Sequence, residues 1–230
     1  MRELSEFDKA EIIDSIPETD LVMFCPGLQG RGGKLLDRSV NAGHGTITGA
    51  SWAGTPRGLT CLSFDGIANK VTMAAGLKVL PATGKITVAA WVNPATTVGN
   101  IDALSRNYYA AGGFGLRTSQ NNGQFKPVLY AGGATRQLGN AGAVPALTWT
   151  FLAFSYELND MKEYINGALT LAGGGAWGAL ANPNNDITLA LNADTAYYPG
   201  KVAMSMIWGR VLTVTELLRL YTRQRHIFGV

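Results

Sequence analysis

Short runs of alternating apolar and polar residues recur along this chain, separated by clusters of glycine, asparagine and proline. Alternation with a period of two predicts β-strands, and the clusters predict tight turns between them. The predicted strands cover residues 21–26, 45–49, 59–65, 69–74, 86–93, 101–106, 113–118, 124–131, 148–156, 160–165, 168–172, 186–191 and 200–208. This spacing favours an all-β, antiparallel sandwich of two sheets over a fold in which strands alternate with helices.

The side-chain pattern of three predicted strands indicates which faces are buried. In 86–93 every second residue is apolar, so we expect one face to enter the core. The strand 200–208 follows the same rule. Its core face is expected to carry Val202, Met204, Met206 and Trp208. In 148–156 large apolar residues fall on both faces, which predicts a central strand covered on both sides.

Farther along, Asn166 and Gly167 predict a type I′ hairpin turn, because both residues accept a positive φ.

The two ends of the chain differ from its middle. Near the C-terminus, Thr213 and Glu216 form a capping box ahead of several leucines, which predicts a short helix. At the other end, residues 1–19 predict an arm that Pro17 terminates. We therefore expect an N-terminal arm over 1–19 and a single domain over 20–230.

Composition and charge refine this picture. The chain has 230 residues, of which 47% are hydrophobic and 15% charged, with 29 glycines; this suits one large β domain that needs no disulfides. Residues 1–20 carry seven acidic and two basic side chains, a net charge of −5, whereas the remaining residues carry nine acidic and 17 basic, a net charge of +8. The contrast predicts an acidic arm on a basic body; the other interpretation is a solvated leader on a mildly basic domain.

Several classes of protein are disfavoured. No segment approaches the roughly 20 apolar residues of a membrane span. The basic residues form no run or patch, which disfavours nucleic-acid binding. The N-terminus has acidic residues where a signal peptide has its apolar core, so we expect synthesis in the cytoplasm. Cys25 and Cys61 lie in apolar segments without metal-ligand spacing, so we expect buried free thiols, with a disulfide between them as the alternative.

Five segments in the same order resemble the laminin-G-like domains of the concanavalin A-like lectin/glucanase superfamily, of the kind found in tailed-bacteriophage structural proteins. The segments are the opening stretch 21–50, "LSFDG" at 62–66, "ITVAAWVNP" at 86–94, "TWTFLAFSYELNDMKEYING" at 148–167 and "YPGKVAMSMIWGRVLTVTELLRLY" at 198–221. The resemblance implies an antiparallel jelly-roll sandwich with a C-terminal helix.

The chain departs from this family where members often carry acidic residues. Ala68 and Asn69 follow the "FDG" turn, and Ala203 and Met204 follow "GKV" in the last strand. Calcium prefers several hard oxygen ligands, so we expect no cofactor and regard calcium as disfavoured. The carboxylates that remain, Asp37 and Asp65, are expected to cap turns through the backbone.

Enzymatic activity is not expected. Relatives that hydrolyse glycosides need two carboxylates facing one cleft. The most closely spaced pair in the body, Asp160 and Glu163, flanks a predicted hairpin at odd separation, so the two side chains should point to opposite faces and solvate the hairpin. His44 lies in a turn and His226 near the end of the chain, without a nucleophile motif beside either.

Loop aromatic residues are the candidate ligand-binding side chains. Sugars stack their C–H faces on exposed rings, and large rings dominate binding energy. The candidates are Tyr108, Tyr109, Trp177, Tyr197 and Tyr198. Asn107 and Asn192, among other loop asparagines, are candidates for polar contacts. The alternative is that these rings cover the ends of the sandwich.

Two functions fit these features. The first is a non-enzymatic structural or decoration protein of a tailed-phage virion, made in the host cytoplasm, present in many copies or as a homo-oligomer and able to hold host-surface glycans. In it, Phe7, Ile12 and Ile13 would attach the arm to capsid or tail proteins. The second is a carbohydrate-binding or adhesion module of a bacterial cell surface or secreted system.

Overall fold

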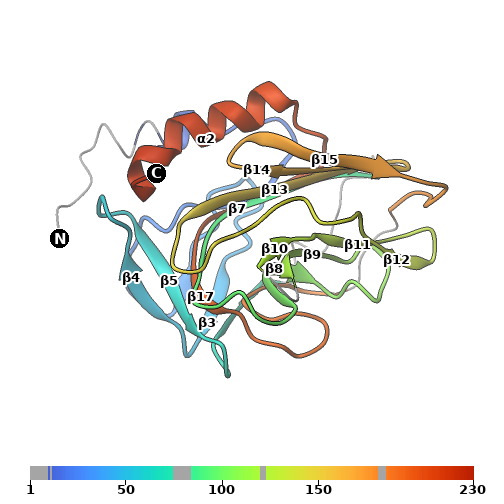
Figure 1. Cartoon of the computed structure of the whole chain (residues 1–230). Helices are drawn as coiled ribbons and strands as arrows, with labels where there is room; N and C mark the ends of the chain where they lie inside the picture. Colours follow the sequence, from blue (N-terminus) through green and yellow to red (C-terminus); the bar gives the residue numbers. More distant parts are fainter. Residues whose placement is uncertain (1–9, 11, 75–83, 120–122, 181–184) are drawn as a thin grey trace.

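The computed structural model describes residues 10, 12–74, 84–119, 123–180 and 185–230, and it has three layers. Helix α2 (Val214–Phe228) lies across one face of a sheet that we call the inner sheet. A second sheet, the outer sheet, covers the opposite face of the inner sheet (Figure 1). Every strand pairing is antiparallel, so the prediction of an all-β sandwich with a C-terminal helix is confirmed.

The inner sheet is continuous from one edge to the other. Its strands are, in spatial order, β15 (Ala168–Gly174), β14 (Asp160–Ile165), β13 (Thr150–Glu157), β7 (Lys85–Pro94), β17 (Pro199–Trp208), β5 (Thr60–Asp65) and β4 (Ser51–Gly54), with β1 (Leu21–Cys25) also pairing with β17.

The outer sheet is built from shorter strands. Its spatial order is β12 (Ala134–Arg136), β11 (Val128–Ala131), β9 (Phe114–Ser119), β8 (Ile101–Arg106), β16 (Ile187–Leu189), β6 (Lys70–Met73), β3 (Gly45–Thr48) and β2 (Lys34–Leu35), with β10 (Gln124–Phe125) pairing with β9. Each predicted strand overlaps an observed one, although 124–131 divides into β10 and β11. The pattern missed β2, β4 and β12, because strands of two to four residues are too short to show alternation.

Strand β13 confirms the prediction of a central strand covered on both faces. It lies between β14 and β7. Phe154 and Tyr156 belong to the apolar cluster between the two sheets. Phe151 belongs to the second cluster, between the inner sheet and α2, where Trp91 stacks on Phe228 with 4.0 Å between ring centroids. The two sides of one strand therefore support two separate cores.

Strand β17 corrects the prediction of one apolar face. Val202 faces the outer sheet, whereas Met204, Met206 and Trp208 pack on the α2 side. The pairing with β7 shifts between Ala203 and Met206, and Met204 has a φ of 48°. Such a bulge adds a residue to one strand and reverses the alternation beyond it.

Local signals for the turn and the helix are confirmed. Asn166 and Gly167 have φ values of 52° and 76° at the β14–β15 turn. The Thr213 hydroxyl accepts from the Glu216 N–H at 3.2 Å, and the Glu216 carboxylate accepts from the Thr213 N–H at 2.8 Å. Gly229 then ends the helix in a left-handed conformation.

Within the predicted N-terminal arm over 1–19, residues 12–17 pack against the domain. Ile12 and Ile16 are buried in the cluster beneath α2. Trp208 Nε1 donates to the Pro17 carbonyl at 2.7 Å, which fastens the segment to β17. Attachment to another protein through Ile12 is therefore wrong, because Ile12 is part of this domain's core. Ile13 remains 47% exposed, and Phe7 lies outside the described residues.

The prediction that Asp160 and Glu163 both solvate the β13–β14 hairpin is wrong for Glu163. Asp160 is exposed and pairs with Lys162 at 2.6 Å, but Glu163 is fully buried. Neither Glu163 oxygen has a hydrogen-bond partner among the described residues. Burial raises the pKa of Glu163 to about 8, against the opposing effect of Lys126. The two carboxylates do point to opposite faces: Glu163 lies on the same face as Met161 and its cross-strand partner Phe154, toward the outer sheet, whereas Asp160 meets water.

Cys25 and Cys61 are both buried and unpaired, which confirms the prediction of free thiols. Burial raises the pKa of Cys61 to about 11, with a smaller opposing effect of Lys201. Over the part of the chain that the structure describes, no helix is long and apolar enough to cross a bilayer.

The packing of the N-terminal segment predicts different effects for two neighbouring residues. Ile12→Ala should lower the free energy of unfolding by about 2–4 kcal/mol, because it leaves a cavity beneath α2. Ile13→Ala should cost less than about 0.5 kcal/mol, because its side chain is half exposed. Urea denaturation measures both changes. Equal losses for the two variants would contradict the packing of this segment.

The buried carboxyl of Glu163 predicts a loss of stability at high pH. Its pKa is raised from 4.5 to about 8 in the folded protein. The stabilising contribution is therefore present below pH 4.5 and is lost as the pH rises through about 8, by roughly 2–4 kcal/mol. Glu163→Gln cannot ionise and should remove this dependence. Urea denaturation between pH 5 and 9 tests it, with Glu157→Gln, an exposed carboxylate, as the control; an unchanged pH dependence in Glu163→Gln would refute the assignment.

Candidate functional site

Two loops meet above the outer sheet, on the face that points away from the inner sheet. The loop after β8 supplies Tyr108 and Tyr109, and the loop after β16 supplies Asp194. The Tyr108 hydroxyl donates to Asp194 Oδ2 at 2.5 Å, and the Tyr109 hydroxyl donates to Asp194 Oδ1 at 2.6 Å. The two rings meet edge to face, with 4.8 Å between centroids. One carboxylate thus joins two loops that are 85 residues apart in sequence.

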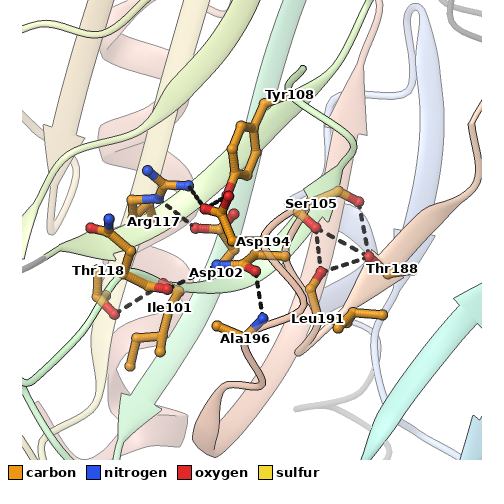
Figure 2. Close-up of polar contacts among 12 residues, drawn as sticks. Ile101, Asp102, Ser105, Tyr108, Arg117, Thr118, Thr188, Leu191, Asp194 and Ala196 are labelled. Atoms are coloured by element: carbon orange, nitrogen blue, oxygen red, sulfur yellow. Dashed lines mark hydrogen bonds and ion pairs between the residues drawn. The ribbon is translucent and has the colours of Figure 1, made fainter. Parts of the chain in front are cut away.

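The sheet beneath these loops supplies a buried ion pair. Asp102 on β8 and Arg117 on β9 are paired residues whose side chains leave the sheet on the outward face. Arg117 Nε donates to Asp102 Oδ1 at 2.9 Å, and its guanidinium lies over the Tyr108 ring at 4.5 Å from the centroid. Figure 2 shows Tyr108 and Arg117 both directed toward Asp194, whose Oδ2 lies 3.9 Å from Arg117 NH2. We call Asp102, Tyr108, Tyr109, Arg117 and Asp194 the tyrosine–carboxylate cluster.

Gly115 makes room for this ion pair. A Cβ at this position would lie 2.6 Å from Asp102 Oδ2, too close for two non-bonded atoms. Only glycine lets β9 approach the Asp102 carboxylate so closely.

The two carboxylates of the cluster have different environments. Burial raises the pKa of Asp102, and Arg117 offsets only part of that effect. Partial burial would also raise the pKa of Asp194, but hydrogen bonds from Tyr108 and Tyr109, with Arg117, outweigh it and lower the pKa. The Asp194 side chain is 41% exposed, whereas Asp102 is fully enclosed. Asp194 is therefore an ionised acceptor within reach of a ligand, and Asp102 is a support for Arg117.

The loop that carries Asp194 is held by polar contacts on both sides. Asn192 is buried; its side chain donates to the Asn100 carbonyl at 2.8 Å and accepts from the Ala196 N–H at 2.8 Å. Before it, the Leu191 carbonyl accepts from Ser105 at 2.5 Å and from Thr188 at 2.8 Å (Figure 2). These contacts keep the loop in one position, so Asp194 needs little reorganisation to bind.

The structure separates the predicted aromatic residues into exposed and buried ones. Tyr109 is 57% exposed, and Tyr197 is half-buried in the same loop as Asp194. Tyr108 and Tyr198 are fully buried, so the prediction that their rings meet a ligand is wrong. Tyr108 lies under Arg117 and Tyr109, and Tyr198 precedes β17 and packs in the core between the sheets.

Trp177 is not part of the tyrosine–carboxylate cluster. Its ring stacks on Tyr156 with 6.3 Å between centroids, and it packs against the core between the sheets. The turn between β11 and β12 contacts the Trp177 carbonyl near Gly132, while Thr135 on β12 donates to the Tyr108 carbonyl at 3.1 Å. This hairpin therefore lies between the two aromatic groups. Trp177 is half-buried and packs against the core, which fits the alternative that such rings cover the sandwich.

The sequence interpretation missed Asp102, Arg117 and Asp194. A signal for the first two was present, because charged residues within predicted strands 101–106 and 113–118 must be paired if they are buried. Asp194 lies in the segment "NADTAYYPG" beside Asn192, which was considered instead as a ligand contact. In the structure Asn192 holds the loop and Asp194 faces solvent.

The described residues contain no group of three His, Cys, Asp or Glu side chains that could hold a metal ion. Asp65 Oδ1 accepts from the N–H groups of Ile67, Ala68 and Asn69 at 2.8, 3.1 and 3.2 Å. Asp37 likewise accepts from backbone N–H groups, including those of Phe24 and Gly43. The prediction that these two carboxylates cap turns is confirmed.

The arrangement suits a ligand with both apolar and hydroxyl surfaces. The exposed Tyr109 ring offers a flat apolar face, and the adjacent Asp194 carboxylate offers hydrogen-bond acceptors. A polyhydroxylated ring can use both at once.

Comparisons with known proteins agree with this architecture. Residues 65–218 match the family model described as the concanavalin A-like lectin/glucanases superfamily. No curated protein sequence matches the chain. Among solved structures, the chain is similar to domain 4 of AbnA, a GH43 extracellular arabinanase from Geobacillus stearothermophilus in complex with arabinotriose: TM-score 0.71, 19% identity, 89% of this chain and 100% of that chain.

Two other neighbours show how widely the fold is used. The receptor-binding domain of botulinum neurotoxin C/D mosaic serotype has a TM-score of 0.71 at 12% identity, over 90% of this chain and 52% of that chain. A sialidase from Trypanosoma rangeli has a TM-score of 0.66 at 17% identity, over 90% of this chain and 33% of that chain. The chain thus spans about half of the toxin domain and a third of the sialidase. At these identities the likeness shows the fold alone.

The buried ion pair predicts a strong coupling between Asp102 and Arg117. Arg117→Met should lower the free energy of unfolding by about 3 kcal/mol, because it leaves an unpaired buried carboxylate. Adding Asp102→Asn should recover a large part of that loss, because the carboxylate is then gone as well. A double-mutant cycle by urea denaturation measures the coupling. Additive losses in the double variant would contradict a buried pair.

Proposed function

Because the chain belongs to the concanavalin A-like lectin/glucanase superfamily, we propose that it is a non-catalytic domain that binds a neutral glycan at Tyr109 and Asp194. The observation that carries the proposal is the exposed Tyr109 ring, held by its hydroxyl against an ionised and partly exposed carboxylate. The ring stacks on the C–H face of a sugar, and Asp194 accepts hydrogen bonds from the sugar hydroxyls.

The charge of the site selects among glycans. Asp194 accepts hydrogen bonds and repels another carboxylate, so acidic sugars are disfavoured at this position. Arg117 does not change this preference, because its guanidinium pairs with Asp102 and lies against the Tyr108 ring. The arabinanase domain that was solved with arabinotriose, a neutral oligosaccharide, supports a ligand of this class.

The same cluster supports a binding role over a catalytic one. Glycoside hydrolysis needs two carboxyl groups that both reach the substrate. Asp102 is enclosed and bonded to Arg117, so Asp194 is the carboxylate of the cluster that can touch a ligand. A single carboxylate beside an aromatic ring is sufficient for recognition.

As a second proposal, the domain decorates the virion of a tailed bacteriophage, where many copies give avidity to weak glycan binding. Support comes from the acidic residues before position 20 and from the exposed side chain of Ile13. Capsid and tail genes beside this one would favour the virion. Genes for cell-wall or secreted proteins would favour an adhesion module of a bacterial surface instead.

The glycan proposal predicts which variants lose binding. Tyr109→Ala should weaken binding to neutral oligosaccharides about tenfold or more, because it removes the stacking surface. Asp194→Asn should also weaken it, because it removes the charged acceptor. A neutral-glycan array followed by isothermal titration measures both effects.

Leu158→Ala is the matched control, because Leu158 is as exposed as Tyr109 but lies in the β13–β14 turn. It should bind as the wild type does. Equal binding by Tyr109→Ala and wild type would refute the proposal.

A further inference from the structure

The inner sheet carries a cleft on its α2 side, away from the tyrosine–carboxylate cluster. Its volume is about 480 Å³, within the range of small-molecule sites. The walls come from the β4–β5 turn, the ends of β7 and β17, residues 147–149 and the end of the chain after α2. Segments far apart in the sequence thus form one concave surface.

The polar groups of the cleft are mainly donors. Lys201 and Asn93, paired across β17 and β7, both line it. Among the described residues, neither the Lys201 ammonium nor the Trp149 indole N–H has an ion-pair or hydrogen-bond partner. The lining contains no Asp or Glu side chain. Val230 also lines the cleft, but its oxygen accepts from Arg225 Nε at 2.8 Å, so the Lys201 ammonium beside amide and indole donors still complements an anion.

Thr55 adds an unsatisfied polar group to the wall. It is 4% exposed, and its hydroxyl has no hydrogen-bond partner within the described part of the chain. A buried polar group left unpaired costs about 1–3 kcal/mol. The Thr55 oxygen is closed to solvent, so it makes the wall more polar without contacting a ligand directly.

Leu147 also lines the cleft. It has a φ of 57°, in the left-handed region that a leucine rarely adopts, and its side chain is 76% exposed. Its N–H donates to the Pro94 carbonyl at 2.7 Å, which holds this backbone in place. The fold therefore maintains an unfavourable conformation that places an apolar side chain beside Trp149 and Lys201.

We propose that this cleft is a second binding site, for a carboxylate-bearing sugar such as a uronic acid. Lys201 pairs with the carboxylate, Asn93 and the Trp149 N–H bind ring hydroxyls, and Leu147 covers the apolar face. A single lysine matches a monoanionic carboxylate, whereas recognition of phosphate commonly uses an arginine fork or several backbone N–H groups. The two sites then bind different sugars. The positive charge of Lys201 favours acidic sugars in the cleft, and the negative charge of Asp194 favours neutral sugars at the tyrosine–carboxylate cluster.

The proposal can be tested on the full chain with two probes. Sodium glucuronate is the acidic sugar, and glucose is a neutral sugar of the same shape. Glucuronate should shift the Trp149 indole N–H resonance in a titration followed by nuclear magnetic resonance, and glucose should not at the same concentrations. Lys201→Met should weaken glucuronate binding about tenfold or more, and Lys201→Arg should retain most of it. Urea denaturation of each variant confirms that it folds.

Separate variants distinguish this site from the neutral-glycan site. Tyr109→Ala should leave glucuronate binding unchanged, and Lys201→Met should leave neutral-glycan binding unchanged. Equal shifts from glucose and glucuronate would overturn the proposal, because the charge would then play no part. So would a Trp149 resonance that glucuronate does not move in the wild type, a result that needs no variant to interpret.

Discussion

The fold depends on an inner sheet that is covered on both faces. The outer sheet packs on one face, and helix α2 with residues 12–16 packs on the other. Strands β7, β13 and β17 must therefore be apolar on both sides. The Trp91 ring, stacked on Phe228 at 4.0 Å, shows how closely the helix covers the sheet. The Trp91 indole N–H remains satisfied there, because it donates to the buried Gln224 side chain at 2.8 Å.

This double coverage decides where functional side chains can lie. The centre of the inner sheet has no face that meets solvent, so polar groups that reach a ligand are confined to the outer sheet and to the ends of strands. The outer sheet accordingly carries the Asp102–Arg117 pair on its open face. A buried pair contributes little net stability, but it holds Tyr108 and Asp194 in fixed positions. The cleft beside Lys201 begins where the cover of α2 ends.

One fold can serve proteins with different functions. The neighbouring structures include a domain solved with arabinotriose, a toxin's receptor-binding domain and a sialidase, all at 19% identity or less. The residues of the two proposed sites, Tyr109, Asp194 and Lys201, lie in loops or near a strand end. A function for such a domain must therefore be argued from its sites and not from its sandwich.

The sequence by itself determined the elements and most of their faces. Alternation located every strand longer than four residues, and the Asn166–Gly167 turn and the Thr213 cap followed from local backbone chemistry. These features depend on residues within a few positions of one another, so a single sequence contains the information. In contrast, the sequence could not show which of the predicted aromatic residues are buried and which are exposed.

Tertiary structure alone decided which predicted side chains were covered. Glu163 is buried because its face of β14 meets the outer sheet, and Ile12 because α2 packs over it. Tyr108 is buried beneath Arg117, and Asp194 joins two loops that are distant in sequence. In each case the partner comes from another part of the chain, so alternation can assign a residue to a face but cannot show what covers that face.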